Sequence, residues 1–453
     1  MVEKINSDLT VGPISKHFRT LAIPMAIGMV FYTLYNMVGI YFAGKLSTSA
    51  QAGLGIGHLI YFFLIAFGFG LNAAMAGLIG NLLGEGNING AKKIVAQGIV
   101  FSIFISVSLI LLGFVFGSFT LNLVSEPGLY RYYASRYFHF LLMSLPAFLI
   151  SYTCNGALQA QGDSLSMQRA LTIAFFLSII LTPFLIFGIP RVWLGLGFDG
   201  IILSAVIGQF AIMSYMIWKL CKSKLGLNMS ISYIGVYQSS YYKIFNQMLP
   251  ACLSFQMVII GSLIVQFALK GFGEQALAGY NVALRIEQLL LLPILGMTQA
   301  LLPIVAQNFG AQQYDRVRKA LFYCWKFGVV MMIIAYPVIW VLGAKILAIF
   351  TTNREVIDIG VGYLRIDGLI LPLYAMLFAV NSFLQGVARP ASIFWIGLFR
   401  QGILTGVFIW MFISVLGFGV WGVWLGAGTS VILGWILSMF IAGRIARIEI
   451  GGL

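Results

Sequence analysis

Two acidic residues of this chain, Glu287 and Asp367, lie inside long apolar stretches of the sequence. A charge at mid-membrane depth costs at least about 2.5 kcal/mol, so each of these residues needs a physical reason to be there. A carboxylate in such a place can bind Na⁺ together with neutral oxygen ligands. It can also take up a proton, because burial disfavours its charged form. We therefore predict cation binding at Glu287 and Asp367, with metal ligation only if the cation is Na⁺.

Each acid follows an arginine by two residues, which leaves a structural alternative open. Glu287 could pair with Arg285, and Asp367 with Arg365, so that each pair anchors a helix end. For the two arginines we favour this role of charge partner, or snorkelling toward the outer surface. Gln256 lies in an apolar stretch without any acid, and its amide oxygen is a further candidate ligand for the cation.

Uncharged polar side chains within or near the apolar stretches form a second group of candidates. Their amides and ring faces could line a substrate cavity and contact an aromatic or cationic compound. The alternative is packing between helices, because polar groups in lipid seek partners across helix contacts. We favour packing for Tyr32, Tyr280 and Tyr374, and also for the two asparagines that occupy matching places in the repeat described below. The group consists of Tyr32, Tyr35, Asn36, Asn155, Tyr280, Tyr374 and Asn381.

The composition identifies the solvent in which these side chains are placed. Of 453 residues, 60% are hydrophobic and 9% are charged, whereas soluble domains carry about 25% charged residues. So few charges cannot solvate a water-facing surface of this size, and the composition indicates a bilayer protein. The net charge of +14 comes from basic residues in short segments between apolar runs, which argues against nucleic-acid binding. The sequence has no Walker A motif and no CxxC spacing, and its histidines are scattered. We therefore expect no cofactor.

Apolar runs long enough to cross the bilayer as helices recur twelve times. About 20 residues at 1.5 Å each cross roughly 30 Å of hydrocarbon. The runs are apolar on all faces, which excludes the alternating strands of a barrel. With the N-terminus inside, the inner segments carry sixteen Lys and Arg and the outer segments eight, so both termini are predicted to face the cytoplasm. The spans are 20–43, 54–80, 94–117, 138–158, 167–188, 199–220, 246–269, 282–307, 320–342, 363–386, 393–416 and 419–442.

The second half of the sequence repeats the first. When the chain is shifted along itself so that Pro24 falls on Pro250, Pro146 falls on Pro372 without a gap. In the same register Asn155-Gly-Ala-Leu-Gln159 falls on Asn381-Ser-Phe-Leu-Gln385. Matches at Pro, Asn and Gln are much rarer by chance than matches at Leu or Gly, so they indicate a duplicated unit of six spans.

An even number of spans gives the two copies the same orientation. The predicted fold is therefore an all-α membrane protein of two six-helix lobes, related by a pseudo-two-fold axis along the membrane normal. We expect an N-terminal lobe over 1–225, a cytoplasmic linker over 226–245 and a C-terminal lobe over 246–453. A cavity between such lobes can open to alternate sides as the lobes rock.

Several motifs resemble those of the multidrug and toxic compound extrusion (MATE) transporters, part of a superfamily that includes lipid-linked precursor flippases. Leu34-Tyr-Asn-Met-Val-Gly-Ile-Tyr-Phe-Ala-Gly44 is similar to the family pattern LYNxVDxxFxG. Ala306-Gln-Asn-Phe-Gly-Ala-Gln312 is similar to GQNxGA, and Leu158-Gln-Ala-Gln-Gly-Asp163 to LRGxGD. The resemblance covers nearly the whole chain, and it implies that acids of the C-terminal lobe couple transport to a cation.

The chain departs from the family pattern at one position. Where the family places an Asp in the first helix, this sequence has Gly39. In many members that Asp binds the coupling cation in the N-terminal lobe. The departure puts an N-terminal ion site in doubt and leaves the coupling to the C-terminal acids.

The resemblance implies a secondary active exporter of organic cations or amphipathic compounds, driven by entry of H⁺ or Na⁺. A lipid-linked precursor flippase is the alternative. A flippase would favour a more cationic cavity. In this chain Arg400 is the only arginine well inside a span, apart from the arginines next to the two acids, and this argues against a flippase. A membrane-embedded enzyme and a passive channel are disfavoured, because catalytic clusters are lacking and a duplication fits alternating access better. We expect a monomer in a bacterial inner membrane, with a small-molecule substrate and the lipid bilayer as its partners.

Overall fold

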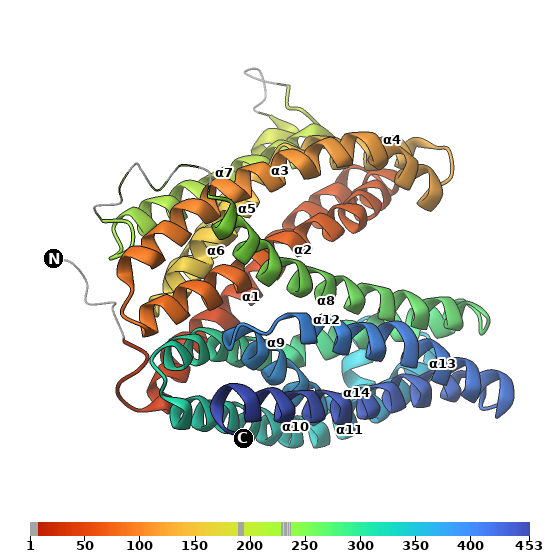
Figure 1. The fold of residues 1–453 in the computed structure, drawn as a ribbon. Helices are drawn as coiled ribbons and strands as arrows, with labels where there is room; N and C mark the ends of the chain where they lie inside the picture. The colour runs from red at the N-terminus through yellow and green to blue at the C-terminus, as the bar shows by residue number, and fades with distance from the viewer. Residues whose placement is uncertain (1–7, 189–193, 228–229, 231–232, 234, 236) are drawn as a thin grey trace. The chain divides into compact units, whose positions relative to one another are not determined.

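The computed structural model describes residues 8–188, 194–227, 230, 233, 235 and 237–453. Over these residues the secondary structure is helical, with no strand (Figure 1). Eleven helices within them are long and apolar enough to cross a membrane. A twelfth span is the pair α4 (Leu129–Leu142) and α5 (Leu145–Ala160), which is bent by 52° at a short break. The predicted all-α membrane fold is confirmed, with twelve spans when the bent pair is counted as one.

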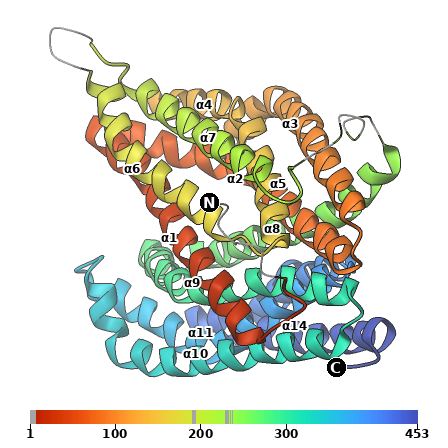
Figure 2. The ribbon, with the colours of Figure 1, turned by 90° about the vertical axis from the view of Figure 1, so that its left-hand side faces the viewer.

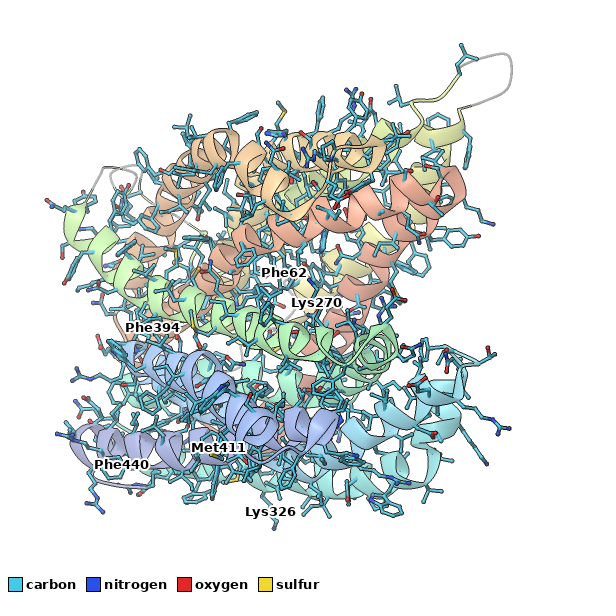
Figure 3. The ribbon with its side chains drawn as sticks, turned by 90° about the vertical axis from the view of Figure 1, so that its right-hand side faces the viewer. Phe62, Lys270, Lys326, Phe394, Met411 and Phe440 are labelled. Atoms are coloured by element: carbon cyan, nitrogen blue, oxygen red, sulfur yellow. The ribbon has the colours of Figure 1, made fainter. Side chains whose placement is uncertain are left out.

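The helices carry apolar side chains on their outer faces as well as in their cores. Phe440 in α14 is 69% exposed, and Figure 3 shows such side chains projecting from the helices. In water this surface would cost about 25 cal/mol for each Å² of apolar area, whereas lipid tails accept it. The remaining helices are α1 (Ile14–Leu46), α2 (Thr48–Gly84), α3 (Ile88–Val124), α6 (Leu165–Phe187), α7 (Phe198–Cys221), α8 (Gln238–Lys270), α9 (Glu274–Gly310), α10 (Tyr314–Ala348), α11 (Arg354–Gly386), α12 (Ala391–Gly397), η2 (Leu398–Leu404), α13 (Thr405–Trp410), η3 (Met411–Val415) and α14 (Gly419–Ile450).

Most helices are longer than the predicted spans, and at the starts of α2 and α3 a side-chain cap sets the end of the helix. The side chain of Ser47 accepts a hydrogen bond from Ala50 N (3.0 Å) at the start of α2. Asn87 does the same for Gly90 N (2.8 Å) at the start of α3. These caps satisfy backbone donors that a helix start leaves unpaired. Helical structure therefore continues past the hydrocarbon, and hydropathy predicted only the central part of each helix.

The helix bounds reproduce the sequence repeat. Helices α2 and α9 both have 37 residues, and their first residues, Thr48 and Glu274, match in the register that places Pro24 on Pro250. The last residues of α5 and α11, Ala160 and Gly386, match in the same register. The copies also differ. The bent pair α4–α5 of the first half corresponds to the single continuous helix α11 of the second, and α6 corresponds to the span from α12 to η3, which contains two π-helical stretches.

The chain divides into two compact units. Unit 1 contains Pro24–Cys252, and unit 2 contains Leu9–Ile23 together with Leu253–Leu453. These units differ from the lobes expected from the sequence. Unit 2 includes the first turns of α1, and unit 1 includes the linker and the start of α8 (Figure 2). Helices α1 and α8 are therefore each shared between the two units.

Hydrogen bonds hold each of these exchanged segments in its unit. In unit 2, Leu9 N donates to Gln307 Oε1 (2.9 Å), and Arg316 Nη1 donates to the carbonyl of Gly12 (2.9 Å). In unit 1, Tyr237 N donates to Gln97 Oε1 (3.1 Å). The segment that leads into the first helix of each half thus belongs to the unit built mainly from the other half.

Candidate functional site

Both intramembrane acids are buried inside unit 2. Glu287 on α9 is 7% exposed and Asp367 on α11 is 4% exposed. The two helices pack against each other, which brings the acids into one region of the unit. At this degree of burial no solvent shell offsets the cost of burying these carboxyl groups.

Glu287 is held by a tyrosine that the sequence analysis missed. Tyr363 Oη donates a hydrogen bond to Glu287 Oε2 over 2.5 Å. Tyr363 lies one helical turn before Asp367 on α11, and that spacing is the signal that could have identified it. A charge-assisted bond of this kind orients the carboxyl group and stabilises it in a buried place.

An aromatic cluster packs around Tyr363, the partner of Glu287. The ring of Tyr363 packs edge-on against Tyr280, with centroids 5.2 Å apart, and against Trp424 at 5.1 Å. Tyr280 also stacks on Trp424 at 5.9 Å. Such rings fill the space with apolar surface and few polar groups, which lowers the local dielectric and strengthens any charge interaction within it.

The carboxyl group of Asp367 has an unsatisfied oxygen. Its Oδ2 is buried and has no hydrogen-bond partner among the described residues. An ionised carboxylate in this condition forfeits its hydration without compensation. A proton on the carboxyl group, or a cation beside it, removes that cost. The unpartnered oxygen of Asp367 and the carboxyl group of Glu287 are oxygen ligands of the kind that a hard cation such as Na⁺ prefers.

The expected charge pairing of the acids with Arg285 and Arg365 is not formed. The three ion pairs of the described chain are Arg136–Asp199, Arg318–Asp315 and Arg389–Glu449. Arg285 and Arg365 are exposed, and Arg365 lies over the ring of Trp340 at 4.5 Å. The physical reason is helical geometry, because residues two apart point to nearly opposite faces of a helix. A buried acid therefore turns its neighbouring arginine outward.

The other candidates of unit 2 have different surroundings. Tyr374 stacks on Phe378 with ring centroids 6.1 Å apart, and it lies two turns after Asp367 on α11. Asn381 Oδ1 is buried without a hydrogen-bond partner among the described residues. Gln256 is half-buried on α8. A contact of these side chains with substrate or cation stays a prediction.

Three candidates of unit 1 are grouped near Gly39. A cavity of about 50 Å³ is lined by Tyr35, Asn36, Gly39 and His58, together with hydroxyl side chains of α6 and α7. Tyr35 donates to the carbonyl of Ala205 (3.1 Å). Asn36 donates to the carbonyl of Tyr32 (2.8 Å), so Tyr32 adjoins this group through its backbone. The cavity has room for roughly two water molecules, and no carboxyl group lines it.

Asn155, the remaining candidate of unit 1, links two helices. Its Nδ2 donates to Asn72 Oδ1 (2.9 Å), and Asn72 in turn donates to Gln159 Oε1 (3.3 Å). These amides join α2 to α5 in the interior of unit 1. The repeat equivalent of Asn72 in the second half is Thr298, so Asn381 lacks the amide partner that Asn155 has.

The acid pair is a property of the second half alone. The repeat equivalents of Glu287 and Asp367 in the first half are Tyr61 and Leu141. Tyr61 Oη bonds to Ser144 Oγ at 3.2 Å, an uncharged contact. The two halves share their helices, but only the second offers buried carboxyl groups at these positions.

Comparisons with known proteins agree with the fold. The MatE family model matches residues 24–184 and 250–411, one match in each half. The chain is 24% identical to an FAD transporter of Shewanella oneidensis, over 97% of this chain and 96% of that protein. It is 24% identical to the multidrug export protein MepA of Staphylococcus haemolyticus, over 84% of this chain and 83% of that protein.

Solved structures show the same architecture. A crystal structure of MATE in the bent conformation has a TM-score of 0.92 at 20% identity and covers 100% of this chain and 99% of that chain. A MOP superfamily transporter from Pyrococcus furiosus has a TM-score of 0.90 at 20% identity, with the same coverage of both chains.

Proposed function

The chain belongs to the MatE family, and we propose that it is a secondary active multidrug exporter coupled to a cation through Glu287 and Asp367. Members of this family are membrane transporters rather than enzymes, and the multidrug export relatives support efflux of small molecules. The substrates that we propose are organic cations or amphipathic compounds, and the driving ion is H⁺ or Na⁺.

The observation that carries the coupling proposal is the state of Asp367. Its Oδ2 is buried and unpartnered among the described residues, and neither Asp367 nor Glu287 takes part in an ion pair of the described chain. A buried acid with a purely structural role would be expected to form an ion pair with a guanidinium group or to accept hydrogen bonds from several donors. A carboxyl group left without them favours uptake of a proton or a cation from outside the protein.

Cation uptake at this site can drive conformational change by differential affinity. A ligand shifts an equilibrium only as far as it binds one state better than the other. The two compact units supply the two bodies that alternating access requires. A cation that neutralises the acids in one state, and leaves when they meet water in the other, would give each transport cycle its direction.

Transport in proteoliposomes tests this proposal. We would measure export of an organic cation under an inward pH gradient or an inward Na⁺ gradient, for wild type, Glu287→Gln and Asp367→Asn. The expected result is at least a tenfold loss of gradient-driven export in both variants. Glu126→Gln, which removes an exposed acid between α3 and α4, serves as the matched control and should export like wild type. Wild-type export by both buried-acid variants under either gradient would refute coupling at these residues.

The FAD transporter relative favours a second candidate substrate class. That protein matches nearly the full length of this chain, and FAD carries a pyrophosphate rather than a cationic group. The same proteoliposomes, loaded with FAD or with a lipid-linked pyrophosphate precursor, distinguish flavin nucleotide export and lipid-precursor flipping from drug export. Competition by FAD against an organic cation would assign both compounds to one pathway.

We further propose that the protein resides in a bacterial inner membrane with both termini in the cytoplasm, as the Lys and Arg distribution predicts. The relatives named above come from bacteria. Labelling of single cysteines, placed at either end of the chain in whole cells, tests the orientation. Reaction with a membrane-impermeant reagent from outside would contradict it.

A further inference from the structure

One buried charge of unit 2 has no place in the coupling mechanism above. Arg400 is 8% exposed, and no carboxylate of the described chain lies within ion-pair distance of its guanidinium group. The guanidinium carbon lies 5.7 Å from the centroid of the Tyr374 ring. Tyr374 is a hydrogen-bond partner of this group, but a buried arginine without an ion-pair partner is expensive in a membrane, so its retention requires a reason.

The surrounding helices are shaped to hold this side chain. Arg400 lies on the π-helical stretch η2, and its carbonyl accepts a hydrogen bond from Thr405 Oγ1 (2.9 Å), which also contacts Ser430 Oγ of α14 (3.0 Å). On α14, a Cβ atom at Gly434 would come within 2.5 Å of the aliphatic stem of Arg400. A π-helical stretch often marks a functional position, and here a facing glycine makes room for the stem.

Arg400 is close enough to the acid pair to interact with it electrostatically. Tyr374 lies beside the guanidinium group of Arg400. Glu287 also interacts with Arg400 directly through their charges. Tyr374 and Asp367 lie two turns apart along one face of α11. The guanidinium group is therefore near enough to act on the acids, yet it leaves the unpartnered oxygen of Asp367 open.

The charges buried in unit 2 can be counted. Among its described Asp, Glu, Lys and Arg side chains, Glu287, Asp367 and Arg400 are the buried ones. With both acids ionised they sum to one negative charge, and one monovalent cation brings the sum to zero. In a low-dielectric interior a residual charge is costly, so the neutral count is favoured.

We propose that Arg400 is a resident counter-charge that limits the acid pair to one monovalent cation per transport cycle. This inference rests on the coupling role proposed for Glu287 and Asp367. Arg400 is a positioning and stoichiometry-setting residue, and it does not itself bind the transported cation. Without its charge, neutrality would require two cations.

The stoichiometry can be measured at static head in proteoliposomes. The substrate gradient that just balances an imposed pH or Na⁺ gradient, at fixed membrane potential, gives the number of cations exchanged per substrate. We expect one for wild type, two for Arg400→Gln and one for Arg400→Lys, which keeps the charge without the guanidinium shape. Arg444→Gln removes an exposed arginine of α14 and should leave the value at one. A value of one for Arg400→Gln, or of two for wild type, would overturn the proposal.

A compensated variant keeps the test decisive if Arg400→Gln does not fold. The double variant Arg400→Gln with Glu287→Gln restores a single buried negative charge, so we expect it to fold and to bind one cation, counted on purified protein. Failure of this variant to recover folding or cation binding would contradict charge counting. If the single acid variants lose coupling while Arg400→Gln still exchanges one cation per substrate, only the counter-charge proposal fails. If the acid variants keep coupling, the proposed function itself fails.

Discussion

At the scale of single residues, the hydroxyl of Tyr363 supports the buried acid. Its hydrogen bond to Glu287 Oε2 is 2.5 Å long, and Tyr363→Phe removes the donor while it keeps the ring. We expect a loss of about 1–3 kcal/mol in the free energy of unfolding, because a buried acceptor is left unsatisfied. Thermal unfolding in detergent measures the change.

A second tyrosine provides the matched control for this prediction. Tyr323 of α10 stacks on Phe18, and its hydroxyl has no hydrogen bond among the described residues. Tyr323→Phe should therefore leave the unfolding temperature nearly unchanged. Equal effects of the two substitutions would show that the bond to Glu287 contributes no stability.

The sequence located the acids but not their partners. A carboxyl group in an apolar run is conspicuous, so Glu287 and Asp367 could be selected without a structure. The alternative of ion pairs with Arg285 and Arg365 is not formed in the described chain, because proximity in sequence does not put side chains on one helix face. The spacing of Tyr363 from Asp367 could have identified it as a neighbour of one acid, but its bond to the other acid, Glu287, joins two helices and could not be read from the sequence.

At the scale of elements, two turns of the second half are strained relative to those of the first. Gln312 and Ala388 have φ of 57° and 59°, in the left-handed region that favours glycine. Their repeat equivalents in the first half are Gly86 and Gly162, with φ of 75° and 82°. The duplicated turns share one conformation, but the second copy has no glycine at these positions.

Replacing the strained residues should stabilise the protein. We expect Gln312→Gly and Ala388→Gly each to raise the free energy of unfolding by about 0.5–1 kcal/mol, because relief of left-handed strain exceeds the entropy that glycine adds to the unfolded chain. Gly86→Ala, where a Cβ atom meets nothing within 4 Å, should destabilise by strain alone. Denaturation in detergent compares the variants. A gain in stability from Gly86→Ala would contradict the backbone argument.

Element boundaries were the least predictable part of the fold. Hydropathy placed a span at 138–158, whereas the structure has α4 and α5 bent by 52° about a break at Met143 and Ser144. Apolar residues continue through that break, so hydropathy has no means to detect it. The repeat also did not predict the break, because α11 continues through the equivalent positions with Pro372 in its interior.

At the scale of the whole molecule, the exchange of helix beginnings limits how the units can move. Helix α1 passes from unit 2 to unit 1 at Pro24, and α8 passes from unit 1 to unit 2 just after Pro250. The sequence did not predict that α1 and α8 are each shared between the units. When lobes are assigned from the repeat, every helix of one half is placed in the same lobe. If the units rock during transport, as we propose, these two helices must bend where they pass between them.

The prolines at these crossings are suited to that bending. Proline removes a helix hydrogen bond and clashes with the preceding turn, so a helix bends there at low cost. Pro24→Ala and Pro250→Ala restore the bond and stiffen the helices. We expect each substitution to slow transport several-fold in proteoliposomes, with an unchanged or raised unfolding temperature.

Prolines that lie within one unit separate hinge bending from general effects on helices. Pro183 of α6 belongs entirely to unit 1 and Pro337 of α10 entirely to unit 2, so neither helix has to follow a movement between units. Their replacement by alanine should leave the transport rate close to that of wild type. If all four substitutions slowed transport alike, stiffness would matter throughout the bundle and the crossings would have no special role. A loss confined to Pro24 and Pro250 would instead place the bending where the chain exchanges its units.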